Sequence, residues 1–219
     1  MKKQLYLNFS YSKWIWLFGG VMIIVNLTLT AFQSADNIQP LIEIINILNI
    51  IALGYTMSSM QSIHARIREN DSHQFLYALP VRKSEILRAD CIYHIIMLLL
   101  TVAVFSSYVT IGHKYHLYYG LLMLVGASLF MMSLYNIMFS QTWIQNVYIK
   151  TFIYFIPLGI IFMFHVMPLN NTFIYDLDLG AAWEFYLFRI PFIVLVAGAL
   201  VYAVSYYFAK KKIIKSDII

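Results

Sequence analysis

Charged residues are scarce in this chain. Only 11% of its 219 residues are Asp, Glu, Lys or Arg, whereas 61% are hydrophobic. Soluble domains carry about 25% charged residues, because a folded surface in water has to be hydrated. A chain with so few charges cannot cover such a surface. The composition therefore excludes a soluble globular protein and predicts an integral membrane protein.

Cysteines and metal-binding clusters are also missing. Cys91 is the only cysteine, so the chain can form neither an internal disulfide nor a thiolate metal cluster. Of the six histidines, only His113 and His116 lie close together, and no third metal ligand accompanies them in sequence. We expect no metal site.

Motifs that bind nucleotide phosphates are absent from the sequence. It contains neither a G-x-x-x-x-G-K-[ST] loop nor a G-x-G-x-x-G fingerprint. Nothing resembles a hydrolase triad or a paired-carboxylate motif either. We therefore expect a chain without catalytic residues or a bound cofactor, and one that does not hydrolyse ATP by itself.

Long apolar runs, in contrast, occur six times. A helix needs about 20 apolar residues to cross the ~30 Å hydrocarbon layer, and the cost of unpaired backbone groups in lipid forces such a run to be helical. The runs are 14–32, 41–60, 92–112, 117–139, 147–167 and 186–209. With no internal repeat and no flexible linker evident, the sequence predicts an all-α polytopic membrane protein in which residues 1–219 form one domain.

The basic residues are distributed unequally between the two sides of these spans. Of the 15 lysines and arginines, only Lys114 and Arg189 fall on one side. Cytoplasmic loops carry the excess of Lys and Arg in membrane proteins. We therefore predict that both termini and the long polar segment 61–91 are cytoplasmic. The basic residues cluster beside apolar runs, which favours anchoring at a lipid bilayer over binding of nucleic acid.

Several polar side chains lie within the predicted spans. Glu43, Asn46 and Asn49 recur every three residues, so they cover about a 120° arc of one helix. Asn26 and Asn136 add amides in two other spans. One interpretation is that these five residues line a translocation path. The other is that they form hydrogen bonds between helices, each worth ~0.6–2 kcal/mol.

Two further segments give local expectations. The basic N-terminal residues 2–14 are expected to form either an interfacial helix along the inner leaflet or a frayed tail. In the last span, small residues from Ala197 to Ala203 predict a close helix approach, either within the subunit or against a second one.

The cytoplasmic segment 61–91 has an organised pattern. Phe75, Leu76 and Leu79 make an apolar face, and Pro80 suits the first position of a new helix that leads into the third span. Charged residues follow, namely Arg82, Lys83, Glu85 and Arg88. Such a segment can bind a groove in a soluble partner or lie on the lipid headgroups.

The run Leu79-Pro80-Val81-Arg82-Lys83-Ser84-Glu85-Ile86, with Ala89 after it, carries a resemblance. Placed after the second of six spans, it resembles the permeases of the ABC-2 exporter family, and in finer detail those of staphylococcal phenol-soluble modulin exporters. The resemblance covers the whole chain in its number of spans.

This resemblance implies a function. The chain would be a permease in a bacterial cell membrane, paired with a second permease subunit. Two separate ABC ATPase subunits would bind ATP and Mg²⁺, and the segment after the second span would be the coupling helix. The implied coupling residues are Phe75, Leu76, Leu79, Pro80, Val81, Arg82, Lys83 and Glu85. An amphipathic, cytolytic peptide would be the cargo, and its export would give self-immunity. The resemblance also implies short re-entrant helices within residues 168–185.

Two alternatives remain open from the sequence. The chain could be a stand-alone carrier or scaffold, with segment 61–91 lying on lipid. It could also be an intramembrane enzyme that uses Glu43, the asparagines and His94.

Overall fold

The computed structural model describes residues 2–32, 39–59, 63, 82–141, 147–174 and 180–216. These residues are almost entirely helical, and no strand occurs among them. Six helices are long and apolar enough to cross a membrane. The predicted all-α fold with six candidate spans is therefore confirmed.

The first half of the chain forms one group of helices. A short N-terminal helix is followed by two spans and then, beyond segment 64–81, by the long third span. Their bounds are α1 Lys2–Tyr11, α2 Lys13–Phe32, α3 Gln39–Met57 and α6 Lys83–Val109.

The second half is joined to the first by a tight turn. Two short 3-10 segments, Ile111–His113 and Tyr115–Leu117, lead into α7 (Tyr118–Gln141). Within this turn Gly112 has φ +71°, a left-handed conformation that glycine adopts without a steric cost.

The last two spans are each interrupted by a π-helical segment. The fifth consists of α8 (Val147–Ile161), the π segment Phe162–Val166 and α9 (Met167–Ile174). The sixth consists of α10 (Ala181–Glu184), the π segment Phe185–Arg189 and α11 (Ile190–Ser216). No other π-helical segment occurs within the described ranges.

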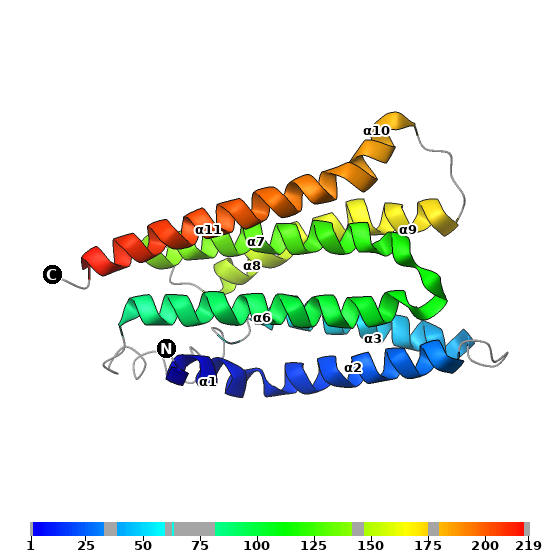
Figure 1. The fold of residues 1–219 in the computed structure, drawn as a ribbon, viewed down its shortest axis with the longest axis horizontal. Coiled ribbons are helices and arrows are strands. Elements are labelled where there is room, and N and C mark those ends of the chain that lie inside the picture. Colours follow the sequence, from blue (N-terminus) through cyan, green and yellow to red (C-terminus); the bar gives the residue numbers. More distant parts are fainter. Residues whose placement is uncertain are drawn as a thin grey trace.

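Helix α6 is the common element of the bundle. It packs against α1, α2 and α3 on one side and against α7 and α11 on the other (Figure 1). Leu87, Tyr93, Met97 and Val104 of this helix are almost completely buried. A displacement of α6 would therefore act on helices in both halves of the bundle.

Among the described helices, α7 and α11 pack most closely together. Gly126 and Gly198 face each other where the two helices cross, and their backbones touch. The small-residue patch in the last span therefore mediates close approach within one subunit, as one of the two interpretations predicted.

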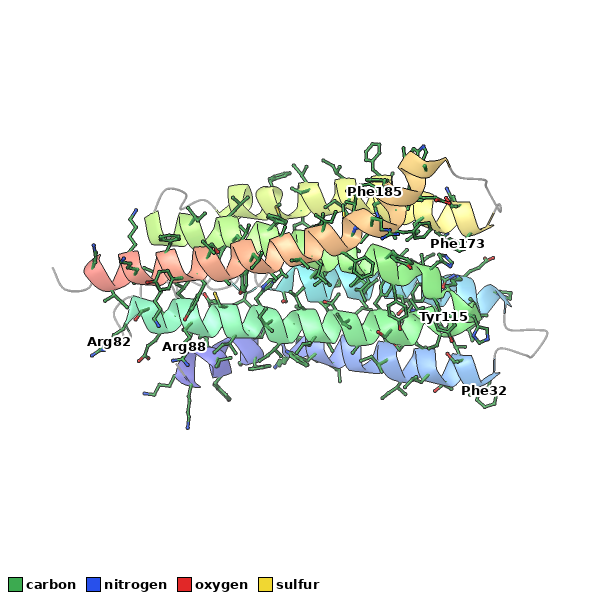
Figure 2. All side chains as sticks on the ribbon, turned by 45° about the horizontal axis from the view of Figure 1, so that its top comes forward. Phe32, Arg82, Arg88, Tyr115, Phe173 and Phe185 are labelled. Atoms are coloured by element: carbon green, nitrogen blue, oxygen red, sulfur yellow. The ribbon has the colours of Figure 1, made fainter. Side chains whose placement is uncertain are left out.

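Basic residues gather at one end of the bundle. The N- and C-termini lie at the same end in Figure 1, and Arg82 and Arg88 lie there in Figure 2, whereas Phe32, Tyr115 and Phe173 lie at the other end. The end with the termini is called the inner end below and the opposite one the outer end. This geometry matches the charge asymmetry from which a cytoplasmic inner end was predicted.

Two local expectations differ from the structure. Residues 2–11 form a helix and not a frayed tail. However, α1 runs nearly in line with α2 and does not turn to lie across the inner end of the bundle, as a helix along the inner leaflet would (Figure 1). The described parts of 168–185 extend the two neighbouring spans outward as α9 and α10. They show no re-entrant helix, because each continues its own span without reversing.

Candidate functional site

The beginning of α6 contains the described part of the predicted coupling segment. Phe75, Leu76, Leu79, Pro80 and Val81 lie outside the described residues.

Arg82 is exposed and has an extended backbone, with φ −62° and ψ 132°. Because this conformation is not helical, α6 begins at Lys83, and the expectation that this helix starts at Pro80 is wrong. The Arg82 carbonyl accepts hydrogen bonds from the amides of Glu85 (2.8 Å) and Ile86 (3.3 Å). Glu85 also places a negative charge in the first turn, where it stabilises the helix dipole.

This first part of α6 has a charged face and an apolar face. Arg82, Glu85 and Arg88 are exposed. Ile86 and Leu87 are buried against the bundle. Arg82 and Arg88 project at the inner end (Figure 2). The charged face is thus presented to whatever adjoins the inner end of the protein.

Of the predicted path residues, the structure brings Asn26 and Asn49 together. Both are fully buried, and their amides exchange two hydrogen bonds of 2.8 Å each. Asn26 also donates to the Ser107 hydroxyl (3.0 Å), and Asn49 donates to the Ile45 carbonyl (2.9 Å). These contacts join α2, α3 and α6. For this pair the interhelical hydrogen-bond interpretation describes the structure.

The other three path residues lie apart from this pair. Asn136, on α7, accepts a hydrogen bond from the Cys91 thiol (3.5 Å) and donates one to the Ser205 hydroxyl (3.2 Å). Glu43 is exposed. Asn46 is half-buried, and its Oδ1 has no hydrogen-bond partner. A single subunit therefore does not assemble the five residues into one polar lining.

A chain of hydrogen bonds crosses the core further towards the inner end. The Tyr154 hydroxyl donates to the carbonyl of Met57, the last residue of α3 (2.8 Å). Its oxygen lies 2.6 Å from the Ser128 hydroxyl, and Ser128 lies 3.1 Å from Nε2 of His94. Because the Tyr154 hydroxyl donates its hydrogen bond to the Met57 carbonyl, Ser128 donates to Tyr154 and accepts from His94. This fixes the Nε2-protonated tautomer of His94 and links α6, α7 and α8 to the inner end of α3.

Sequence reasoning missed a polar contact of the N-terminal helix. Gln4, Asn8 and Ser12 are buried, although each is polar. Asn8 donates to the Asp90 carboxylate (2.9 Å) and accepts from Gln4 (3.3 Å). Residues spaced i, i+4 and i+8 lie on one face of a helix, so the sequence could have indicated this polar face. Asp90, an acidic residue just before the third predicted span, was a residue to which that face could bond. The polar face of α1 thus binds α6.

The structure separates Glu43 from His94, two of the residues named for the intramembrane-enzyme alternative. Glu43 lies more than one turn beyond Asn49 towards the outer end, whereas His94 lies about two turns inward from Thr101, which bonds Thr56 of α3. The structure therefore keeps Glu43 and His94 far apart along the bundle. No group of three or more potential metal ligands occurs among the described residues.

The helices and the composition together define a multi-pass α-helical membrane protein. Comparison with protein-family models, with curated proteins and with solved structures finds no match.

Proposed function

We propose that this chain is the permease subunit of an ABC exporter of the ABC-2 type, powered by separate ATPase subunits. The observation that carries the proposal is the run 79–89, with its Leu-Pro, basic and Glu-Ile residues, between the second and third spans of a six-span chain. A permease of an ABC exporter that lacks its own phosphate loop depends on a separate ATPase subunit, and this run is the place where such a partner would bind.

The geometry of α6 supports a binding site at the inner end. This helix has 27 residues and is therefore ~40 Å long, whereas the hydrocarbon layer is only ~30 Å thick. One or two turns consequently extend beyond the layer. Those turns carry the exposed charges of Arg82, Glu85 and Arg88. A soluble partner can reach them without entering the lipid.

The bundle offers a route by which force at this site would reach the transmembrane region. Segment 60–82 connects the inner ends of α3 and α6. The end of α3 is bonded to Tyr154 of α8, and α6 packs on both halves. Closure of paired ATPases would therefore move both ends of the segment and, through them, α8 and α7.

Amphipathic peptides, such as phenol-soluble modulins, are the proposed cargo. Such peptides already concentrate at the inner leaflet, because their apolar face prefers the boundary between headgroups and acyl chains. Glu43 is exposed on the single subunit and is therefore available to a second permease or to cargo. Export of membrane-active peptides would also protect the cell that makes them.

The proposal is tested by co-purification with an ABC ATPase subunit that is co-expressed with this chain. Leu79→Asp combined with Arg82→Glu should abolish co-purification and leave membrane insertion intact. Lys211→Glu is the matched control, because it reverses another exposed charge at the same end of the bundle. Equal co-purification of all three proteins, or full transport by the wild-type chain alone in nucleotide-free vesicles, would refute the proposal.

A further inference from the structure

The two π-helical segments share a sequence pattern. Phe162–Pro168 reads FMFHVMP and Phe185–Pro191 reads FYLFRIP. In each, a phenylalanine begins the π segment and a proline follows six residues later. Only the phenylalanine and the proline are shared, so this is a common spacing and not an internal repeat. In both spans the proline stands at the same distance after the start of the π segment.

Each of these prolines leaves one carbonyl in the preceding turn without a donor. In an α-helix the amide of residue i bonds the carbonyl of residue i−4, and proline has no amide hydrogen. Pro168 therefore leaves the Phe164 carbonyl without its usual donor, and Pro191 does the same for the Leu187 carbonyl. A carbonyl without a donor within the apolar layer costs free energy unless another group bonds it.

Each helix approaches the freed carbonyl of the other. The Tyr186 hydroxyl donates to the Phe164 carbonyl at 3.0 Å. In the opposite direction, His165 is fully buried and its imidazole faces the main chain of Tyr186 and Leu187. Neither of its nitrogens makes a hydrogen bond of normal geometry. The His165 and Tyr186 rings lie edge to face, with centroids 5.3 Å apart.

Beyond this contact, all four residues of α10 and Phe185 after them are exposed. Phe188, three residues further on, packs edge to face on Tyr119 of α7 (4.9 Å) and on Phe173 of α9 (6.2 Å). The Tyr186 hydrogen bond therefore lies at the boundary between a packed helix and a projecting arm.

We propose that the segments Phe162–Pro168 and Phe185–Pro191 form a latch between the outer ends of the last two spans. In this latch the Tyr186 hydroxyl replaces, from the neighbouring helix, the amide that Pro168 lacks. The latch opens so that α9 and α10 separate. The existence of the latch does not depend on the proposed function, whereas its use in releasing cargo on the outer side does.

The test measures the separation of α9 and α10 by electron paramagnetic resonance in lipid nanodiscs. Spin labels are placed at the exposed positions Asn171→Cys and Ala182→Cys, in a Cys91→Ser background. Tyr186→Phe should increase the separated population about three-fold, as expected for one interhelical hydrogen bond in a membrane. Tyr207→Phe, an exposed tyrosine at the inner part of α11, is the control and should change nothing.

A second substitution distinguishes a latch from general packing. Pro168→Ala supplies the missing amide to the Phe164 carbonyl from within the same helix, so the Tyr186 hydroxyl then adds less to the closed state. Tyr186→Phe should therefore increase the separated population less in a Pro168→Ala background than in the wild type. An unchanged distribution in Tyr186→Phe, or an equal effect of Tyr186→Phe in both backgrounds, would overturn the proposal. Should Tyr186→Phe alone fail to fold, recovery of folding by Pro168→Ala supports the latch and absence of recovery refutes it.

The measurement also separates the latch from the proposed function. It uses the permease chain alone, without nucleotide or ATPase. Failure of the chain to bind any ATPase would therefore remove the proposed function and leave the distance result standing. A negative distance result would leave the ATPase co-purification unaffected.

Discussion

Gly198 of α11 lies directly on the backbone of Gly126 of α7, so that a Cβ atom added at Gly198 would come within 2.5 Å of the Gly126 carbonyl oxygen. In the other direction, a Cβ at Gly126 would lie 2.7 Å from the backbone nitrogen of Leu195. Backbone atoms cannot move aside as a flexible side chain can. The two helices can pack this closely only because both positions are glycine.

We expect Gly198→Ala to destabilise the protein by roughly 1–3 kcal/mol, because the added methyl group forces α7 and α11 apart. The free energy of unfolding in mild detergent measures the effect. Gly159→Ala is the matched control, because nothing lies within 4 Å of its added Cβ. The control should be neutral or slightly stabilising. Equal effects at the two positions would show that the close crossing is not required.

The Asn26–Asn49 pair is expected to stabilise the bundle cooperatively. A double-mutant cycle of Asn26→Ala and Asn49→Ala should give a coupling energy of about 0.6–1.7 kcal/mol, the range found for interhelical hydrogen bonds in membranes. Asn46→Leu should be neutral or stabilising, because the Asn46 oxygen is buried without a partner. Additive effects of the two alanine substitutions would contradict the hydrogen-bonded pair.

Loss of the Asn8 side chain is expected to release α1 from α6. Asn8→Leu removes the donor to the Asp90 carboxylate, and loss of such a bond typically costs ~1–3 kcal/mol. Hydrogen exchange of residues 2–11 should accelerate, while that of α7 stays unchanged. Tyr6→Ser, on the exposed face of the same helix, is the control. Unchanged exchange in Asn8→Leu would mean that α1 is held by other contacts.

Tyr154→Phe is expected to loosen the inner end of α3. It removes the donor to the Met57 carbonyl and the acceptor for Ser128, while the aromatic ring stays in place. Faster hydrogen exchange over the last turn of α3 is the expected result. Tyr55→Phe, an exposed tyrosine in α3 itself, should leave that exchange as it is. The same rate in both variants would exclude a role for the bond.

The orientation of the bundle can be tested with single cysteines in a Cys91→Ser background. Tyr115→Cys lies at the outer end and Lys211→Cys near the inner end, and both positions are exposed. A membrane-impermeant maleimide should label Tyr115→Cys in intact cells and Lys211→Cys only after permeabilisation. The reverse pattern would overturn the prediction from the positive-inside rule.

The sequence by itself determined the class of the protein. Its low charge and its six apolar runs left no soluble fold possible, because membrane insertion depends on composition and length, which are properties of single segments. The first, second and fourth spans were therefore predicted to within a few residues. The other three helices extend past their apolar runs: α6 begins at Lys83, the fifth span reaches Ile174, and the sixth runs from Ala181 to Ser216. A helix continues past an apolar run where its backbone hydrogen bonds continue.

Which polar groups meet was decided only by the tertiary structure. The sequence offered five candidate path residues, but the bundle pairs Asn26 with Asn49 and directs Asn136 to Cys91 and Ser205. It also joins Tyr186 to Phe164, and it packs Gly126 on Gly198. Contacts of this kind depend on the rotation and depth of each helix relative to its neighbours. Those are set by packing over the whole bundle, which no local pattern encodes.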